Sequence, residues 1–270
     1  YMNWKQTLFW SFSAAAIFYY FLLFGVFVFV GQEEMQLFIP EWWYIREFLF
    51  QPGGFCAVAG QWIIQYYRQP MSAVVFHTVL LVGCGFMVYR ILRCFSDKTY
   101  LLFLSLLPVL YLVKMSIHGE YLVDGTVGVV LMLLALSVSL KVRRAGSIAG
   151  YGIASTLFLC GLTGLLSVCY AFLYTLLALL RYKTSRQRLA ASACLIPALF
   201  IYLFSGWLGI PVPLSDGWMP EAYLEIQRLP HYYMYRVWTF FTLSIVGVAL
   251  FARFVPVIGE KSKWMDRVAL

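Results

Sequence analysis

Long apolar windows bounded by charged residues recur along this chain, and they predict membrane-spanning helices. The hydrocarbon core of a bilayer is about 30 Å thick, so a spanning helix needs roughly 20 apolar residues. The windows do not alternate apolar with polar residues as β-barrel strands do. We therefore expect an all-α, polytopic transmembrane helical bundle of about eight spans, near Leu8–Val30, Met71–Tyr89, Tyr100–Met115, Leu122–Leu140, Ile148–Cys160, Leu165–Leu180, Ala190–Leu208 and Val237–Phe254.

The fifth and sixth windows form one apolar stretch from Ile148 to Leu180, which a single tilted helix could also explain. Lys and Arg residues cluster both before this stretch, at 141–144, and after it, at 181–188. Because basic residues accumulate on the cytoplasmic side, both ends belong on that side and the stretch crosses an even number of times. The sequence Gly161-Leu162-Thr163-Gly164 is the predicted hairpin turn.

Composition and charge support the same class. The chain is 62% hydrophobic and 12% charged, too few polar residues to cover a water-soluble globule. With eight spans and cytoplasmic N- and C-termini, most of the 20 Lys and Arg residues face the cytoplasm and most of the 12 Asp and Glu residues face outward. The net charge of +8 then reflects loops beside anionic lipid headgroups, and we expect membrane lipids rather than nucleic acid as partners.

We expect one membrane-embedded domain over residues 1–270, with outer loops at 31–70 and 209–236. The chain opens Tyr1-Met2-Asn3, without a charged leader or a cleavage site, so the first window is predicted to remain as a helix. Since the numbering starts at a tyrosine, we treat the chain as a candidate piece of a longer protein. The six cysteines contain no C-x-x-C pair, so we predict neither a disulfide framework nor a zinc site.

The first outer loop, 31–70, predicts two helical pieces separated by Pro52-Gly53-Gly54. Both pieces mix aromatic, aliphatic and polar residues, as helices at a headgroup interface do. The competing interpretation is that the aromatic residues only form a belt at the membrane surface. Glu33 and Glu34 directly follow the first window, where a carboxylate could act as a general base or bind a metal; a solvated helix end is the alternative.

A second candidate group is Lys114, His118, Glu120 and Asp124, around the outer turn between the third and fourth windows. If the third helix continues for one more turn, Lys114 and His118 share a face. A lysine inside an apolar run should bind an anion such as a phosphate, pair with an acid, or extend to the membrane surface, and we weigh all three.

The loop 209–236 carries a predicted amphipathic helix from Pro220 to Leu229 and two of the few outer cations, Arg228 and Arg236. An anionic headgroup bound on this face would have few other positively charged partners. An interfacial loop with an aromatic belt is the competing interpretation.

This layout resembles the N-terminal module of the polytopic GT-C glycosyltransferases: a first span with a cytoplasmic N-terminus, an acidic residue after it, and a long outer loop of two interfacial helices. The resemblance implies that Glu33 or Glu34 serves as catalytic base or metal ligand, so a divalent metal is a candidate cofactor, and that the donor sugar is carried on a polyprenyl phosphate. The usual aspartate-containing signature is absent here. Glu34-Met35-Gln36-Leu37-Phe38 and Gln51-Pro52-Gly53-Gly54 also resemble a bacterial multi-pass inner-membrane family of unknown function.

Two functions follow as hypotheses. The first is a glycosyltransferase in the bacterial inner membrane, with Glu33 or Glu34 as base and Lys114, His118, Arg228 or Arg236 stabilising the departing phosphate. The second is a non-enzymatic membrane subunit that holds a protein partner or handles a lipid or solute. The middle of the spans is almost free of ionisable residues, which argues against an ion-coupled transporter.

Overall fold

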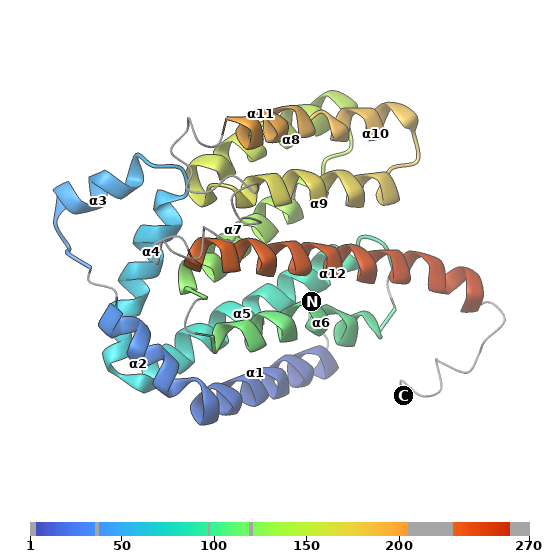
Figure 1. Cartoon of the computed structure of the whole chain (residues 1–270). Coiled ribbons are helices and arrows are strands. Elements are labelled where there is room, and N and C mark those ends of the chain that lie inside the picture. The colour runs from blue at the N-terminus through green and yellow to red at the C-terminus, as the bar shows by residue number, and fades with distance from the viewer. Residues whose placement is uncertain (1–3, 36–37, 97, 119–120, 205–228, 260–270) are drawn as a thin grey trace.

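The computed structural model describes residues 4–35, 38–96, 98–118, 121–204 and 229–259 (Figure 1). Side chains are described over the same ranges, except at 35, 229–236 and 254–259. Within these ranges the chain forms helices and no strand, which confirms the predicted all-α class.

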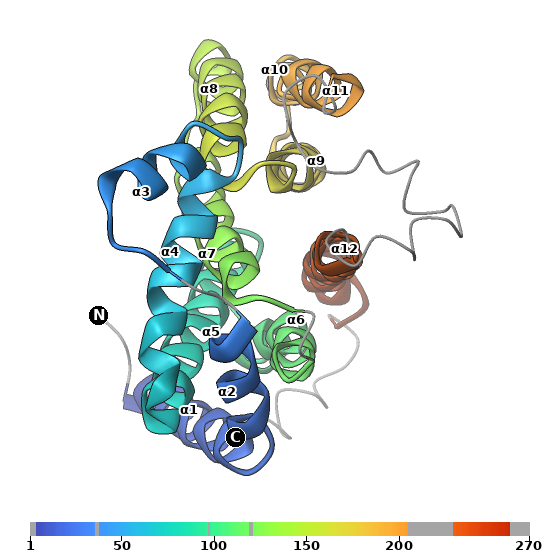
Figure 2. The same cartoon turned by 60° about the vertical axis from the view of Figure 1, so that its left-hand side comes forward.

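Three helices are long and apolar enough to cross a membrane: α1 (Trp4–Phe24), α5 (Pro70–Leu92) and α8 (Ala145–Thr163). Shorter apolar helices accompany them, namely α6 (Leu101–Ser116), α7 (Val123–Ser139), α9 (Leu166–Arg181) and the segment Val237–Arg253 of α12 (Leu229–Gly259). Figure 2 looks nearly along α6, α9 and α12, whose axes run in similar directions. The chain is thus a helical membrane protein with several candidate spans.

Two predicted windows are each divided into two helices. The first is not continuous over Leu8–Val30, because α1 ends at Phe24 and α2 (Val26–Met35) begins after Gly25. The predicted helix Ala190–Leu208 is replaced by α10 (Ser185–Ser192) and α11 (Leu195–Leu203). Gly25 favours the first break, because glycine weakens a helix interior. Pro197 favours the second, because a proline has no N–H to donate and is tolerated in the first turn of a helix, where backbone N–H groups have no acceptor within the helix.

The hairpin predicted between the fifth and sixth windows is confirmed. Helices α8 and α9 are joined at Gly164 and pack against each other. At their other ends, the Tyr182 hydroxyl donates to the Val142 carbonyl oxygen over 2.7 Å. The basic clusters at 141–144 and 181–188 therefore lie at the same end of the bundle.

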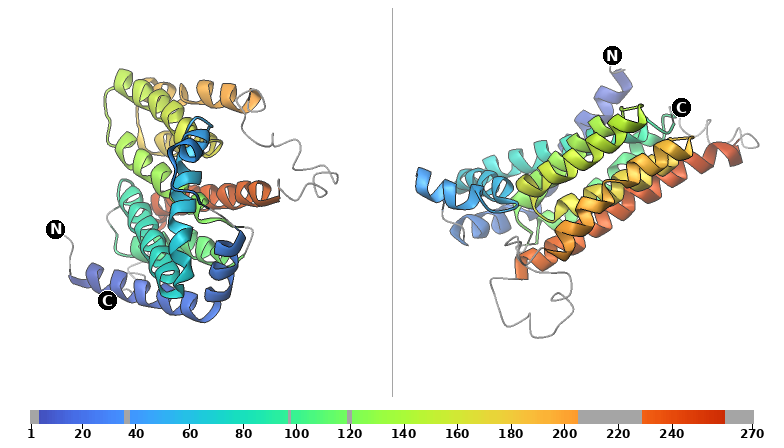
Figure 3. Two further views of the ribbon diagram at one scale, coloured as in Figure 1. Left: turned by 90° about the vertical axis from the view of Figure 1, so that its left-hand side faces the viewer. Right: turned by 90° about the horizontal axis from the view of Figure 1, so that it is seen from above.

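The two helices predicted in the first outer loop are also present, as α3 (Trp42–Leu49) and α4 (Gly54–Ile64), with α4 continued by the 3-10 turn η1 (Gln65–Arg68). We call residues 38–68 the roof. Figure 1 and the right view of Figure 3 show the roof at one end of the bundle, where α4 crosses the direction of the long helices. There α4 packs against α7 and α8.

The turn between α3 and α4 depends on glycine. Gly53 has a φ of 84°, which lies in the left-handed region that residues with a β-carbon rarely adopt. A β-carbon on Gly54 would lie 1.7 Å from the Phe48 carbonyl oxygen, so no larger residue fits there. The Gly53 N–H donates to the Gly161 carbonyl oxygen over 3.0 Å, which docks this turn onto the last turn of α8.

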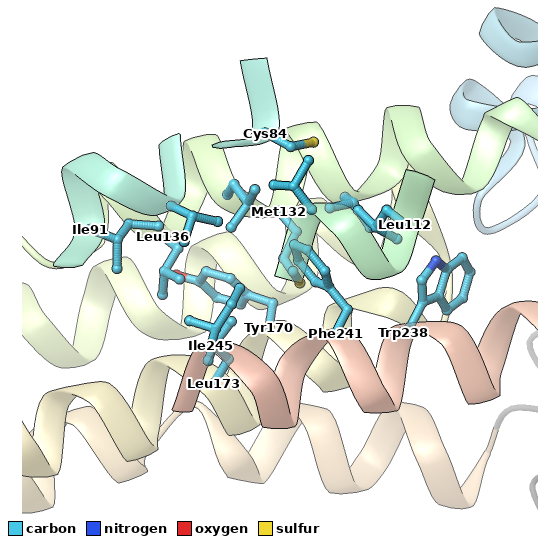
Figure 4. Close-up of a cluster of buried hydrophobic side chains, with 14 of the residues drawn as sticks. Cys84, Ile91, Leu112, Met132, Leu136, Tyr170, Leu173, Trp238, Phe241 and Ile245 are labelled. Carbon is cyan, nitrogen blue, oxygen red and sulfur yellow. The ribbon is translucent and has the colours of Figure 1, made fainter. Parts of the chain in front are cut away.

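The larger of two buried apolar clusters among the described residues joins α1, α5, α6, α7, α9 and α12. Figure 4 shows its centre, where Cys84 of α5, Met132 of α7 and Tyr170 of α9 meet Phe241 of α12. This packing fixes the helix ends on which the roof rests.

Candidate functional site

Helix α2 carries the two predicted catalytic acids and is held against the bundle end. Phe29 and Gln32 are fully buried. The Gln32 side-chain Nε2 donates to the Tyr121 carbonyl oxygen over 3.0 Å. The last turn of α2 is therefore joined to the connection between α6 and α7, so the acids and the second candidate group belong to the same end of the molecule.

Helix geometry separates Glu33 from Glu34. Residues four apart share a helix face, so Glu33 follows the buried Phe29 on the inward side and is only partly exposed. Glu34 is exposed and lies two turns after Phe27, which is 88% exposed. Only Glu33 lies beside the face of α2 that meets the rest of the protein.

Helix α6 ends within one residue of the predicted end of the third window, Met115, and does not continue for another turn. Helix α6 ends at Ser116, and Ile117 leaves the helical conformation with φ −90° and ψ 0°. The conditional face shared by Lys114 and His118 therefore does not form as one continuous helix. Both side chains are exposed at the α6–α7 end. The sequence offers a reason for this end, because Gly119 follows and glycine disfavours continuation of a helix.

Asp124 lies in the first turn of α7, directly beneath α4. A β-carbon on Gly60 of α4 would lie 2.6 Å from the Asp124 β-carbon and 2.9 Å from its α-carbon. The Asp124 side chain remains partly exposed, and its Oδ1 accepts a hydrogen bond from the Gly125 N–H over 2.6 Å. The backbone of α4 thus lies close against the backbone and β-carbon of Asp124, and only a glycine at position 60 allows this contact.

The remaining predicted site residues fall outside the part that can be described. Glu120 and Arg228 lie outside the described residues, and for Arg236 only its place in α12 is described. Among the described residues, no group of three or more His, Cys, Asp and Glu side chains could hold a metal ion. All six cysteines are free thiols.

Side-chain hydrogen bonds join the pieces of the roof. The Tyr44 hydroxyl of α3 donates to the Gln61 Oε1 of α4 over 3.0 Å, and the Gln65 Nε2 donates to the Phe38 carbonyl oxygen over 3.0 Å. Burial raises the pKa of Tyr44, so its hydroxyl keeps the proton that it donates. The roof is therefore a connected unit and not a loose linker.

One buried group was missed by the sequence analysis. His77 of α5 is fully buried, and its Nε2 lies 2.7 Å from the Tyr67 hydroxyl of η1. Its ring stacks on Phe29 of α2, with centroids 4.3 Å apart and planes 10° apart. Tyr67, an aromatic residue of the first outer loop, is also fully buried, so the interpretation as a belt at the membrane surface does not apply to it. The signal was an ionisable residue within an apolar window, which usually has a specific partner.

Comparison with known proteins gives a family and no activity. No curated protein and no solved structure matches the chain. A model of a family of unknown function, DUF6057, matches residues 1–267. The match covers nearly the whole sequence, in line with the resemblance expected from the first outer loop. The chain therefore belongs to the DUF6057 family.

Proposed function

We propose that this protein is a GT-C-like glycosyltransferase that takes a sugar from a polyprenyl-phosphate donor on the extracytoplasmic face of a bacterial inner membrane. The proposal includes eight crossings, with both chain ends in the cytoplasm and the roof outside. One observation carries it: the Gln32–Tyr121 hydrogen bond joins the acid-bearing end of α2 to the α6–α7 connection, next to the roof. A carboxylate and cations from separate helices can then serve one membrane-surface site.

In this mechanism Glu33 acts as the general base. It takes the proton of the acceptor hydroxyl while the acceptor oxygen bonds to the sugar anomeric carbon. The bond from that carbon to the phosphate oxygen breaks, and its electron pair leaves with the polyprenyl phosphate. Lys114 and His118, with Arg228 and with Arg236 of α12, stabilise the negative charge of the leaving phosphate.

Asp124 and Glu120 have a second role in the proposal. Their carboxylates orient the acceptor sugar by accepting hydrogen bonds from its hydroxyls, since a carboxylate is an acceptor-only group when ionised. The glycosyltransferase resemblance also implies a divalent metal: Glu33 would be one of its ligands, and the metal would supply positive charge beside the acceptor hydroxyl. Transfer assayed with and without EDTA separates a metal-dependent reaction from simple base catalysis.

The test is a matched pair of neighbouring substitutions. Purified protein in liposomes is supplied with a panel of polyprenyl-phosphate-linked hexoses, and sugar transfer is measured by mass spectrometry of the lipid extract. Glu33→Gln should lower kcat by about a thousandfold, whereas Glu34→Gln should lower it by less than about threefold. Full activity in both variants and in the double variant would remove the proposed base.

A second candidate function is a non-enzymatic subunit that holds a protein partner at the membrane surface. The observation favouring it is α3, which has no buried residue and exposes Trp42 to 70% and Trp43 to 58%. Large exposed aromatic side chains are frequent in protein interfaces as well as at lipid headgroups. Three results together would favour this function. A partner co-purifies at fixed stoichiometry, the double variant Trp42→Ala/Trp43→Ala loses that partner, and the protein shows no transfer activity.

A further inference from the structure

The buried ring of His77 lies where three segments of the chain meet. Its Nε2 is 2.7 Å from the Tyr67 hydroxyl of η1, and one of the two groups donates to the other. Its face stacks on Phe29 of α2 at 4.3 Å, and Phe21 of α1 lies 5.5 Å from it. One side chain of α5 therefore contacts the roof, α2 and α1 together.

The bend between α1 and α2 brings Phe29 to this ring. Phe29 packs back over Gly25, where a β-carbon would lie 2.8 Å from its ring, and its centroid is 5.5 Å from that of Phe21. A straight helix through 8–30 would carry Phe29 away along the axis of α1. The direction of α2 thus depends on what Phe29 packs on: Phe21, Tyr67 and His77, of which the His77 ring is the nearest and the only one stacked parallel to it.

Helix α2 has two fixed points, and Glu33 lies at the second. Phe29 is held by the His77 ring, and Gln32 is held by the Tyr121 carbonyl oxygen. Glu33 comes one turn after Phe29 and directly after Gln32. Rotation or tilt of α2 about either point would change which acid lies on the inward side.

We propose that His77, oriented by Tyr67, is a positioning residue that sets the direction of α2 and so places Glu33 inward and Glu34 outward. The catalytic meaning of this placement rests on the proposed function. The ring supplies the stacking surface, and the hydrogen bond fixes the plane of that surface relative to the roof.

The experiment reads the placement without using a substrate. In a background with the six native cysteines replaced, Glu33→Cys and Glu34→Cys are introduced separately, and their labelling rates by a membrane-impermeant maleimide are compared in liposomes. With His77 present, position 34 should label at least about fivefold faster than position 33. With His77→Ala, the two rates should come within about twofold of each other.

Matched variants separate positioning from general damage. Leu81→Ala removes a fully buried side chain of the same helix, and it should lower the melting temperature while keeping the labelling difference. The double variant Tyr67→Phe/His77→Phe keeps the stacking ring but loses the hydrogen bond that fixes its plane, so it should reduce the labelling difference by less than His77→Ala does. If His77→Ala does not fold, Phe29→Leu removes the other half of the stack and should abolish the difference in the same way.

A folded His77→Ala or Phe29→Leu protein that keeps the labelling difference would overturn the inference. Its failure can be told from failure of the proposed function, because labelling requires no reaction. If transfer is detected, His77→Ala should lower kcat by about tenfold or more with KM within about threefold, as expected when a reacting group is misplaced. If no transfer is detected in any variant but the labelling difference is lost, the positioning role stands and the enzymatic proposal fails.

Discussion

The roof and helix α9 are held against the bundle by opposite kinds of contact. The roof approaches the bundle where side chains are missing, with Gly53 against Gly164 and Gly60 against Asp124. Helix α9 instead uses side-chain hydroxyls. The Tyr170 and Ser139 hydroxyl oxygens lie 2.7 Å apart, and other tyrosines of the same region donate to backbone carbonyls.

This difference predicts how each region responds to change. A close backbone contact cannot accept an added methyl group without moving one of its two partners. A hydrogen bond between membrane helices contributes about 0.6 kcal/mol on average, so removing one is tolerated. Replacing a glycine of the roof by alanine should therefore lower the free energy of unfolding more than replacing a tyrosine of α9 by phenylalanine. Only the changes in the roof should disturb the end of the bundle that carries Glu33 and Glu34.

The largest effect is expected at the turn between α3 and α4. Gly54→Ala places a methyl group 1.7 Å from a backbone oxygen, so the turn must rearrange. We expect a loss of about 3 kcal/mol in the free energy of unfolding, measured by SDS titration. Gly150→Ala is the control, because a β-carbon there meets nothing within 4 Å, and it should be neutral or stabilising. Equal stability of the two variants would show that the turn is not closely packed.

A smaller loss of stability, with a change in activity, is expected at Gly60. Gly60→Ala places a methyl group 2.6 Å from the Asp124 β-carbon, so α4 must lift or the start of α7 must shift. We expect a loss of about 2 kcal/mol and at least about tenfold lower transfer, because acceptor-orienting groups are displaced. Gly83→Ala, which meets nothing within 4 Å, is the matched control. Wild-type transfer by a folded Gly60→Ala protein would contradict a functional contact between roof and Asp124.

The fold could be predicted wherever a single local signal decided it. Hydrophobic windows bounded by charge identified α5 to α9, and the basic clusters on both sides of Ile148–Leu180 identified the hairpin. The breaks after Phe24 and Ser192 could not be predicted from hydropathy, because Gly25 and Pro197 interrupt runs that remain apolar throughout. An apolar window shows that a segment is buried in lipid or protein, but not that it is straight.

The candidate site could be predicted only as a list of residue types at one end of the molecule. The sequence left Glu33 and Glu34 equivalent, since both follow the same window, and the burial of Phe29 was needed to separate them. The pair Tyr67 and His77 was missed because its two members were judged by different rules, one as a surface aromatic residue and one as part of a span. Contacts between segments decide such cases, and periodicity along one segment cannot supply them.

A modest effect is expected in α9. Tyr170→Phe removes a buried hydroxyl and leaves the Ser139 hydroxyl without this partner. We expect a loss of about 1 kcal/mol in SDS titration, at the upper part of the range for hydrogen bonds between membrane helices. Transfer activity and the labelling difference between positions 33 and 34 should be unchanged. A tenfold loss of transfer in a stable Tyr170→Phe protein would show that the two regions are coupled.

The smallest effect is expected at the far end of α9. Tyr182→Phe removes the hydroxyl that donates to the Val142 carbonyl oxygen, where α9 has ended and basic residues surround the connection. Water reaches a carbonyl group more easily at a bundle end than in its middle, so the lost hydrogen bond is partly replaced. We expect a loss of about 0.5 kcal/mol, smaller than that of Tyr170→Phe in the same SDS titration. The reverse order of these two losses would mean that the end of the α8–α9 hairpin, and not its middle, holds the helices together. The roof and α9 would then differ in their position along the bundle and not in the type of contact that holds them.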